Sequence, residues 1–391
     1  MIKYTMNTTA MKIPSDKLLG ALKEHSEKKQ EYLEKIEKTY SGKRVRISSY
    51  LENIVLPELF GFDMNELYSN PELAIEMELR QKIFWLDNSL DDSDGGKTDI
   101  VNINGSVGMY FDITLFGQKV SHDRSGVPYF QTHPVSQKPD LSLIPPVDFY
   151  SSGEMPPLIK MYNGIQKISG LKYNNRISVD FPSFIRGPLD VYIQLRGYEN
   201  FVADTMERPG FTCAFLEFIA DQRANWNRER CHFLNQSYQP ESTFIADDWI
   251  NVPFISPGIF RKFVIPAYKR IEKQEGILKG FHTCGVITPI VQELLSNFPH
   301  IKSLDVSGWN DFEKLDRVID PSVHFHLNFI NTFVLTGTHE EHREKLKQIA
   351  RIRKRRGVSI CVQAIVRVHD DFAEDLNRMN RFIELARDLT S

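Results

Sequence analysis

Cysteine is scarce in this chain of 391 residues, and its four copies are scattered. They lie at Cys213, Cys231, Cys284 and Cys361, too few and too far apart for a disulfide framework. Uninterrupted apolar runs of about 18 residues are also missing, so no membrane-spanning helix is predicted. The N-terminus lacks the apolar core and small-residue cleavage site of a signal peptide. We therefore expect a cytoplasmic protein whose thiols are reduced.

The chain has no large excess of charge of either sign. Its formal net charge is −3, from 48 basic and 51 acidic residues, so no overall electric field favours nucleic acid. With 41% hydrophobic and 25% charged residues, the composition is typical of a soluble globular protein. The length suits one large domain or two ordinary ones. We expect neither a nucleic-acid nor a membrane partner.

Strand-like segments alternate with helical ones from about residue 175 to the end. The predicted strands are 176–180, 243–248, 278–284, 303–306, 323–328 and 358–366, and amphipathic helices lie between most of them. Such repeats predict a parallel sheet, either closed into an eight-stranded barrel or open and doubly wound. Polar residues gather where the strands end, and this convergence favours the barrel, whose active site lies at that face.

The earlier half of the chain has a different pattern. Residues 15–40 and 56–86 are predicted to be helical, and residues 99–150 read as short strands and turns. We therefore predict an α/β protein with a (β/α)8 TIM barrel over residues 99–391, including a strand-and-turn insertion at about 99–150. A mainly helical N-terminal extension is expected over residues 1–98.

His282 and Cys284 are the most informative pair in the sequence. Two residues apart on one strand, they point to the same side, which in a barrel is the lumen. An imidazole and a thiolate make up half of a tetrahedral zinc site, and a catalytic zinc needs one more protein ligand and an open position. Cys361, the only cysteine further on, also lies in a strand-like segment. The alternative is ordinary packing, with a buried thiol and a histidine bonded to a backbone carbonyl.

Five short segments occur in an order that resembles the uroporphyrinogen decarboxylase superfamily. The resemblance runs from about residue 175 to the C-terminus, and more faintly from about residue 80. The segments are Arg186-Gly-Pro to Gly197, Asp247-Asp248, the Ser-Pro-Gly helix leading to Pro266-Ala-Tyr268, Phe281-His-Thr-Cys-Gly285, and Asn328-Phe-Ile with Leu335-Thr-Gly-Thr-His339.

The superfamily has branches with different chemistry. Its true decarboxylases use no metal and carry an Arg-Gln-Ala-Gly-Arg element that binds substrate carboxylates, which this sequence lacks. Another branch holds zinc-dependent methyltransferases that serve corrinoid proteins, such as methylcobalamin:coenzyme M methyltransferases. Their ligand pattern, His-x-Cys and then a distant Cys, matches His282, Cys284 and Cys361. That branch often has Pro-Gly before the last Cys, whereas this chain has Ser359-Ile.

Other polar residues at strand ends are candidates for the site. We expect catalytic roles for Asp247, Asp248 and His326, and contacts with the cofactor from Asp305 and Asn328. The alternatives are a helix-capping aspartate and a packed histidine.

The resemblance and the ligand types together predict the chemistry. Two thiolates and a neutral imidazole would cancel the charge of Zn²⁺, so a bound substrate thiol would lose its proton yet stay electron-rich. We expect a methyltransferase that moves a methyl group between a corrinoid (methylcobalamin) protein and a thiol or a methylated small molecule. The alternatives are a metal-free decarboxylase or lyase, and a zinc-dependent thiol alkyltransferase that uses another electrophile.

Overall fold

Eight parallel strands form the centre of the described structure, a computed structural model that covers residues 5–40, 44–51, 55–96, 99–105, 110–365, 369 and 371–391. The strands are β1 (Arg46–Leu51), β2 (Val101–Asn104), β5 (Ile177–Asp180), β6 (Ser242–Ala246), β7 (Ile277–Thr283), β8 (Ser303–Ser307), β9 (His324–Phe329) and β10 (Val358–Ile365). Six of them pair in the order β1-β10-β9-β8-β7-β6, and β2 pairs with β5. A single parallel bridge from Arg186, just after β5, to Ala246 links the two groups. The predicted (β/α)8 barrel is confirmed.

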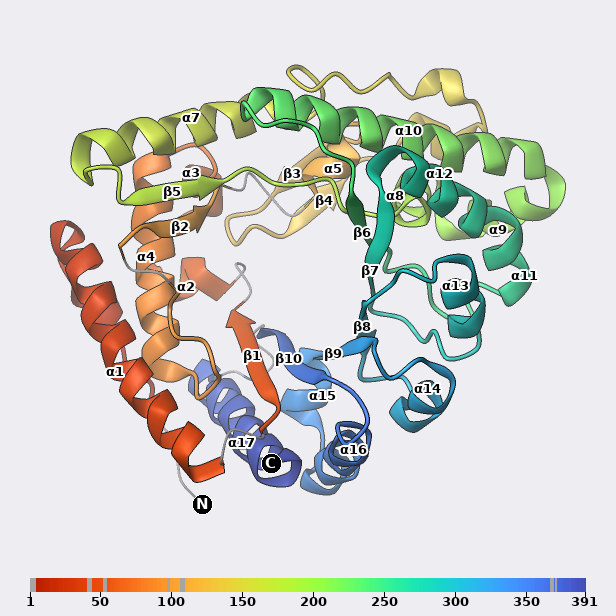
Figure 1. The fold of residues 1–391 in the computed structure, drawn as a ribbon. Helices are drawn as coiled ribbons and strands as arrows, with labels where there is room; N and C mark the ends of the chain where they lie inside the picture. The colour runs from red at the N-terminus through yellow and green to blue at the C-terminus, as the bar shows by residue number, and fades with distance from the viewer. Residues whose placement is uncertain are drawn as a thin grey trace.

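Helices surround the strands (Figure 1). The outer layer contains α1 (Leu18–Tyr40), α4 (Pro71–Asn88), α7 (Met155–Lys172), α8 (Pro188–Arg196), α9 (Tyr198–Glu207), α10 (Pro209–Phe233), α12 (Ile265–Glu275), α13 (Val291–Asn297), α14 (Phe312–Val318), α16 (His339–Ile352) and α17 (Phe372–Thr390). Shorter helices are α2 (Leu56–Phe60), α3 (Met64–Leu67), α5 (Phe111–Thr114), α6 (Pro134–Gln137), α11 (Pro257–Ile259) and α15 (Asn331–Thr336). Within the described residues, none of these helices has the length and apolarity needed to cross a bilayer.

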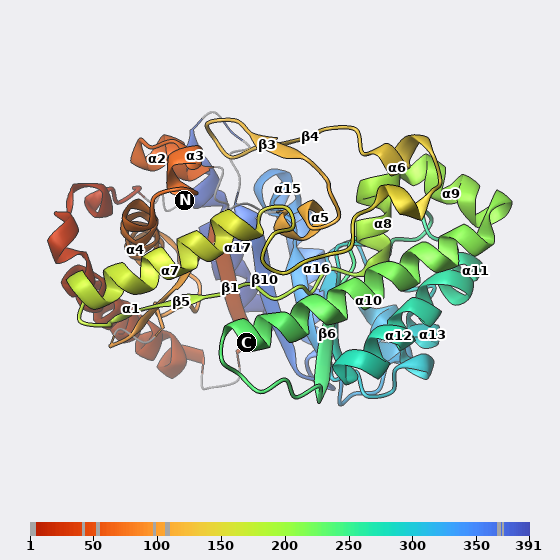
Figure 2. The same cartoon turned by 90° about the horizontal axis from the view of Figure 1, so that it is seen from above.

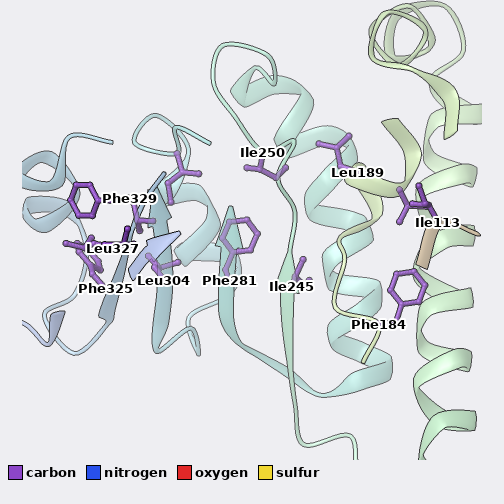
Figure 3. Packing of buried hydrophobic residues seen from close by; sticks show 14 of the residues in the cluster. Ile113, Phe184, Leu189, Ile245, Ile250, Phe281, Leu304, Phe325, Leu327 and Phe329 are labelled. Atoms are coloured by element: carbon purple, nitrogen blue, oxygen red, sulfur yellow. The ribbon is translucent and has the colours of Figure 1, made fainter. Parts of the chain in front are cut away.

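The strands have two chemically different faces. Phe281, Leu304 and Phe325 are fully buried and belong to the hydrophobic cluster between strands and helices (Figure 3). Because side chains alternate along a strand, their neighbours point into the barrel. Those neighbours are polar: His282 pairs in register with Asp305, and Asp305 with His326. Apolar burial against the helices thus fixes which polar residues face the lumen.

The N-terminal segment supplies more than helices. Residues 1–98 contain α1, α2, α3 and α4 as expected, but also β1, which pairs with β10 and places Ser48 opposite Cys361. β1 is a strand of the main sheet because Ile47 and Leu51 pack into the core while Ser48 faces the lumen. The predicted boundary at residue 98 lies outside the described residues, as does Val366, the predicted end of the last strand.

A hairpin lies beside one end of the barrel. Its strands, β3 (Val120–His122) and β4 (Pro128–Phe130), are antiparallel and fall within the predicted strand-and-turn insertion. In Figure 2 the hairpin lies on the same side of the molecule as α2 and α15, which follow the carboxyl ends of β1 and β9. The backbone of Met64 in α3 donates a hydrogen bond to Arg124 in the hairpin loop. The hairpin therefore borders the barrel mouth.

Candidate metal centre

His282, near the carboxyl end of β7, is the centre of the site. Its Nδ1 lies 2.7 Å from Oδ2 of Asp305, the residue beside it in register on β8. An ionised carboxylate only accepts hydrogen bonds, so Nδ1 carries a proton, and Nε2 is the nitrogen that a metal ion would bind once it gives up its own proton. This carboxylate–histidine pairing is the arrangement that orients histidine ligands in metal sites.

Nε2 of His282 faces two further potential ligands. The sulfur of Cys284 lies 3.5 Å away, and Oδ1 of Asp248 lies 3.2 Å away. The ligand atoms of the three residues lie within 4.8 Å of one another. Asp248 Oδ1 also accepts a hydrogen bond from the backbone amide of Cys284, which ties the loop after β6 to the end of β7. The donor set of imidazole, thiol and carboxylate suits a zinc ion.

The protonation of this cluster follows from its burial and its charges. Burial lowers the pKa of His282, but the hydrogen bonds to Asp248 and Asp305 outweigh it and raise the pKa to about 12. Burial raises the pKa of Asp248, but the His282 partner outweighs that effect and lowers it to about 2. The thiol of Cys284 has its pKa raised by burial, against the opposing effect of His282. The metal-free cluster therefore holds an imidazolium where a cation would bind.

Cys361 lies in the same tier of the lumen but outside this group. On β10 its Cα pairs with Asn328 on β9 and with Ser48 on β1. Burial raises the pKa of its thiol to about 11, with Ser48 opposing, and the charges of Asp305 and His282 also act on it. Its sulfur is not within the 4.8 Å group of Asp248, His282 and Cys284. Cys361 is linked to the cluster only through its register partner Asn328, which lies beside His282, so its place as the third ligand stays a prediction.

The two predicted cofactor contacts lie next to His282. Asp305 makes the hydrogen bond described above, and Nδ2 of Asn328 lies 3.5 Å from Nδ1 of the same ring. His326, two residues before Asn328 on β9, is exposed and bonds instead to the hydroxyl of Ser359 at 2.6 Å. The structure thus brings Asp305 and Asn328 to the cluster and leaves His326 in a separate contact.

Asp247 lies on the opposite side of the strand from Asp248. Its carboxyl is fully buried and accepts hydrogen bonds from the Tyr268 hydroxyl at 2.9 Å and the Leu189 amide at 3.2 Å. Burial, and next the charge of Asp190, raise its pKa well above the usual range. Through these hydrogen bonds Asp247 connects α8 and α12 to the end of strand β6.

One group beside Asp248 was missed in the sequence. Arg186 donates to Asp112 at 2.6 Å and to Asp190 at 2.7 Å, and its guanidinium lies 5.3 Å from the centre of the Tyr110 ring. Burial raises the pKa of Asp190, and the charge of Asp248 contributes in the same direction. The four-residue spacing of Arg186 and Asp190 was a readable signal, whereas Asp112 and Tyr110 come from a segment without periodicity.

Carboxylates outnumber cations around the cluster. Asp248 and Asp305 bond the His282 ring, and the charge of Asp248 also acts on Asp190, which shares Arg186 with Asp112. An acidic lumen of this kind favours a dication over an anion.

Comparisons with known proteins agree with this architecture. A family model described as "Uroporphyrinogen decarboxylase (URO-D)" matches residues 102–360, more than half of the chain. No curated protein sequence matches this chain. Among solved structures, a methyltransferase from Methanosarcina mazei superposes with a TM-score of 0.58 at 17% identity, over 88% of this chain and 94% of that one. That likeness shows a shared fold, and the family model covers most of β2, and β5 to β9, together with Asp248, His282 and Cys284. The chain therefore belongs to the uroporphyrinogen decarboxylase family.

Proposed function

We propose that this protein is a zinc-dependent methyltransferase that exchanges a methyl group with a corrinoid protein. The observation that carries the proposal is the cluster of His282, Cys284 and Asp248, with Asp305 holding Nδ1 of the imidazole. The structural neighbour named a methyltransferase, and the absence of the Arg-Gln-Ala-Gly-Arg element from the sequence, support the same branch of the family.

His282 and Cys284 would hold the zinc ion, with Cys361 or Asp248 as the third protein ligand. Bound zinc would lower the pKa of a substrate thiol, or act as a Lewis acid on the oxygen of a methylated substrate. Asp305 keeps the proton on Nδ1, so the proton that His282 gives up for the metal comes from Nε2, whose lone pair would then point at the ion. Asp248 fixes the Cys284 backbone through its amide, which keeps the thiol beside the imidazole.

The barrel mouth offers a surface for a partner protein. Phe254 follows β6 and is 50% exposed, and Trp309 follows β8 and is 60% exposed. Exposed aromatic residues of this kind often anchor protein interfaces. Both lie at the carboxyl ends of strands, the same end as Cys284, so a corrinoid protein docked there would present its cobalt to the lumen.

The experiment that tests the proposal follows the cobalt by its visible spectrum. The zinc-loaded protein is incubated with methylcobalamin and a panel of thiols, and with cob(I)alamin and methoxylated aromatics or methylamines, with a corrinoid protein included. We expect a change in cobalt state that requires His282. If no pair alters the cobalt while a carboxylated substrate releases carbon dioxide, the protein is a decarboxylase. If zinc binds and a thiol is alkylated only by another electrophile such as an epoxide, it is the related alkyltransferase.

A further inference from the structure

A cavity that shares no residue with the His282 cluster is lined by two arginines and by no carboxylate among the described residues. It has a volume of about 450 Å³ and lies between the end of α15, the start of α16 and one face of α17. The three helices lie side by side at the edge of the barrel (Figure 1). Arg378, Arg381, His339 and His342 are its polar lining, and no aspartate or glutamate is among the described residues that line it. A volume of this order holds a small molecule.

Arg381 is the unusual residue of this cavity. Its Nε is buried and makes no hydrogen bond in the described structure, and no ion pair there involves its guanidinium. A buried donor atom without an acceptor is costly in a folded protein, so such atoms usually have a ligand or a function. The rest of the Arg381 side chain is half-buried, and an acceptor that carries negative charge matches a guanidinium best.

The carboxylates nearest in sequence are already engaged or face elsewhere. Glu374 accepts from Nε of Arg378 at 2.9 Å, and Glu341 closes the capping box of α16 by accepting from Thr338. Glu384 shares a helix stripe with Asn380 and Arg387, whose bonds run to Asn88 and Asp92 on the α4 side. Its charge acts on Tyr32 of α1. The protein therefore has no internal counterion for Arg381 among these groups.

Arg378 is positioned to share the ligand. Its Nε is taken by Glu374, and its Nη1 donates to the Leu335 carbonyl at 2.9 Å. These two bonds fix the guanidinium plane, while Nη2 has no protein partner in the described structure. Arg378 and Arg381 are three residues apart, so they lie on the same face of α17. Two guanidinium groups on one face match the geometry of a carboxylate or phosphate.

The remaining wall of the cavity is apolar. Phe382 and Leu385 continue the same face of α17, and His342 closes it. Burial lowers the pKa of His342, although its bond to the Phe333 carbonyl opposes this, and its ring packs against Phe333 and Phe382. His342 is thus part of the wall, whereas exposed His339 stands at the entrance.

We propose that this cavity binds a small molecule with an oxyanion, a carboxylate or a phosphate group, attached to an apolar body. The oxyanion pairs with Arg381 and Nη2 of Arg378, and the apolar part contacts Phe382 and Leu385. This site is separate from the metal cluster and does not depend on the proposed methyltransferase activity.

Calorimetric titration of the full-length protein tests the site. The probes are inorganic phosphate and benzoate, each added at constant ionic strength set with chloride. We expect at least one of them to bind saturably, with one site per chain. Arg381→Gln should weaken that binding about tenfold or more, since charged hydrogen bonds are lost. Arg381→Lys keeps the charge but loses the planar, two-pronged donor geometry of the guanidinium, so its affinity for the probe should lie between those of the wild type and Arg381→Gln. Arg317→Gln on exposed α14 is the matched control and should bind as the wild type does.

A second measurement needs no variant. Phenylglyoxal modifies accessible arginine, and peptide mapping follows the reaction of Arg381 with and without the bound probe. Protection of Arg381 by the probe, with Arg317 unprotected, supports the site. The proposal is overturned if neither probe binds saturably, if Arg381→Gln binds as tightly as the wild type, or if the probe leaves Arg381 unprotected. Because the cavity shares no residue with the His282 cluster, each of these outcomes is independent of whether the protein binds zinc.

Discussion

Nδ1 of His282 donates a hydrogen bond to Oδ2 of Asp305 at 2.7 Å, and the other ring nitrogen, Nε2, lies 3.5 Å from the sulfur of Cys284. The two residues are register partners on adjacent strands, so the hydrogen bond is built into the barrel rather than into a loop. The imidazole is therefore oriented before any ligand arrives, which lowers the entropy lost on metal binding.

The first prediction concerns metal content. Protein expressed with zinc supplied should hold about one zinc per chain, because the described residues bring imidazole, thiol and carboxylate donors together at one place. His282→Gln should reduce this to trace amounts, measured by elemental analysis. His300→Gln alters a histidine outside the cluster and should leave the content unchanged. Wild-type protein with less than a tenth of an equivalent would contradict the zinc site.

Proton release distinguishes the third ligand. At pH 7 the metal-free site holds one proton that zinc can displace on each of His282, Cys284 and Cys361, because their pKa values are raised, whereas Asp248 is ionised because its pKa is lowered to about 2. Zinc binding should release all of these protons if Cys361 is a ligand, and one fewer if Asp248 takes its place. Titration calorimetry in buffers of different ionisation enthalpy counts them.

Variants of the two candidates provide an independent check of that assignment. If Cys361 is the ligand, Cys361→Ser should bind zinc far more weakly and lose transfer activity, while Asp248→Asn keeps the metal. A fully metallated and active Cys361→Ser protein would exclude Cys361, and loss of zinc from Asp248→Asn would then identify Asp248 as the ligand.

Asp305→Asn tests the orienting hydrogen bond. The amide preserves the shape but removes the negative charge that raises the basicity of the imidazole. Zinc affinity should fall about 10- to 100-fold, measured by competition with a chelator. Asp16→Asn, on the exposed N-terminal segment, is the control. An unchanged affinity in Asp305→Asn would mean that the contact has no influence on the metal.

Asp247→Asn should change how stability depends on pH. Burial raises the pKa of Asp247, so between about pH 4 and that raised value the folded chain keeps a proton that the unfolded chain has lost. Wild-type stability should therefore fall as pH rises through this window, by up to about 1.4 kcal/mol per pH unit from this group.

The variant removes that titration and should retain the hydrogen bond from Tyr268. The gap in Tm between Asp247→Asn and wild type, measured on metal-free protein, should widen in favour of the variant from pH 5 to pH 7. A gap that stays constant would show that Asp247 is ionised in the folded state.

Trp309 tests the docking face. Trp309→Ala should slow transfer with a corrinoid protein about tenfold or more, as expected for an aromatic anchor that becomes buried when the partner docks. Transfer with free methylcobalamin should be unchanged. Leu171→Ala is the control, because Leu171 is 74% exposed near the end of α7, just before β5 begins at the other end of the barrel. Equal loss with both forms of the cofactor would place Trp309 at the reaction rather than at the interface.

Local pattern was enough to locate most of the barrel. The predicted strands 176–180, 303–306 and 323–328 match β5, β8 and β9 to within one or two residues, because each is a short apolar alternation between helices. β1 was overlooked, since Arg46-Ile-Ser-Ser-Tyr-Leu51 is short and lies between two helical stretches. Its pairing partner, β10, is more than 300 residues away, and no local signal reports such a contact.

The sequence by itself determined which chemistry was available: the His282–Cys284 spacing puts both side chains on one face of β7, whatever surrounds them. Only the tertiary structure decided which carboxylates join them. Asp247 and Asp248 are neighbours with the same side chain, yet one bonds Tyr268 behind the strand and the other meets His282 in the lumen. The reason is strand alternation combined with packing, because burying the residues around Ile245 against the helices leaves Asp247 on the helix side and Asp248 on the other.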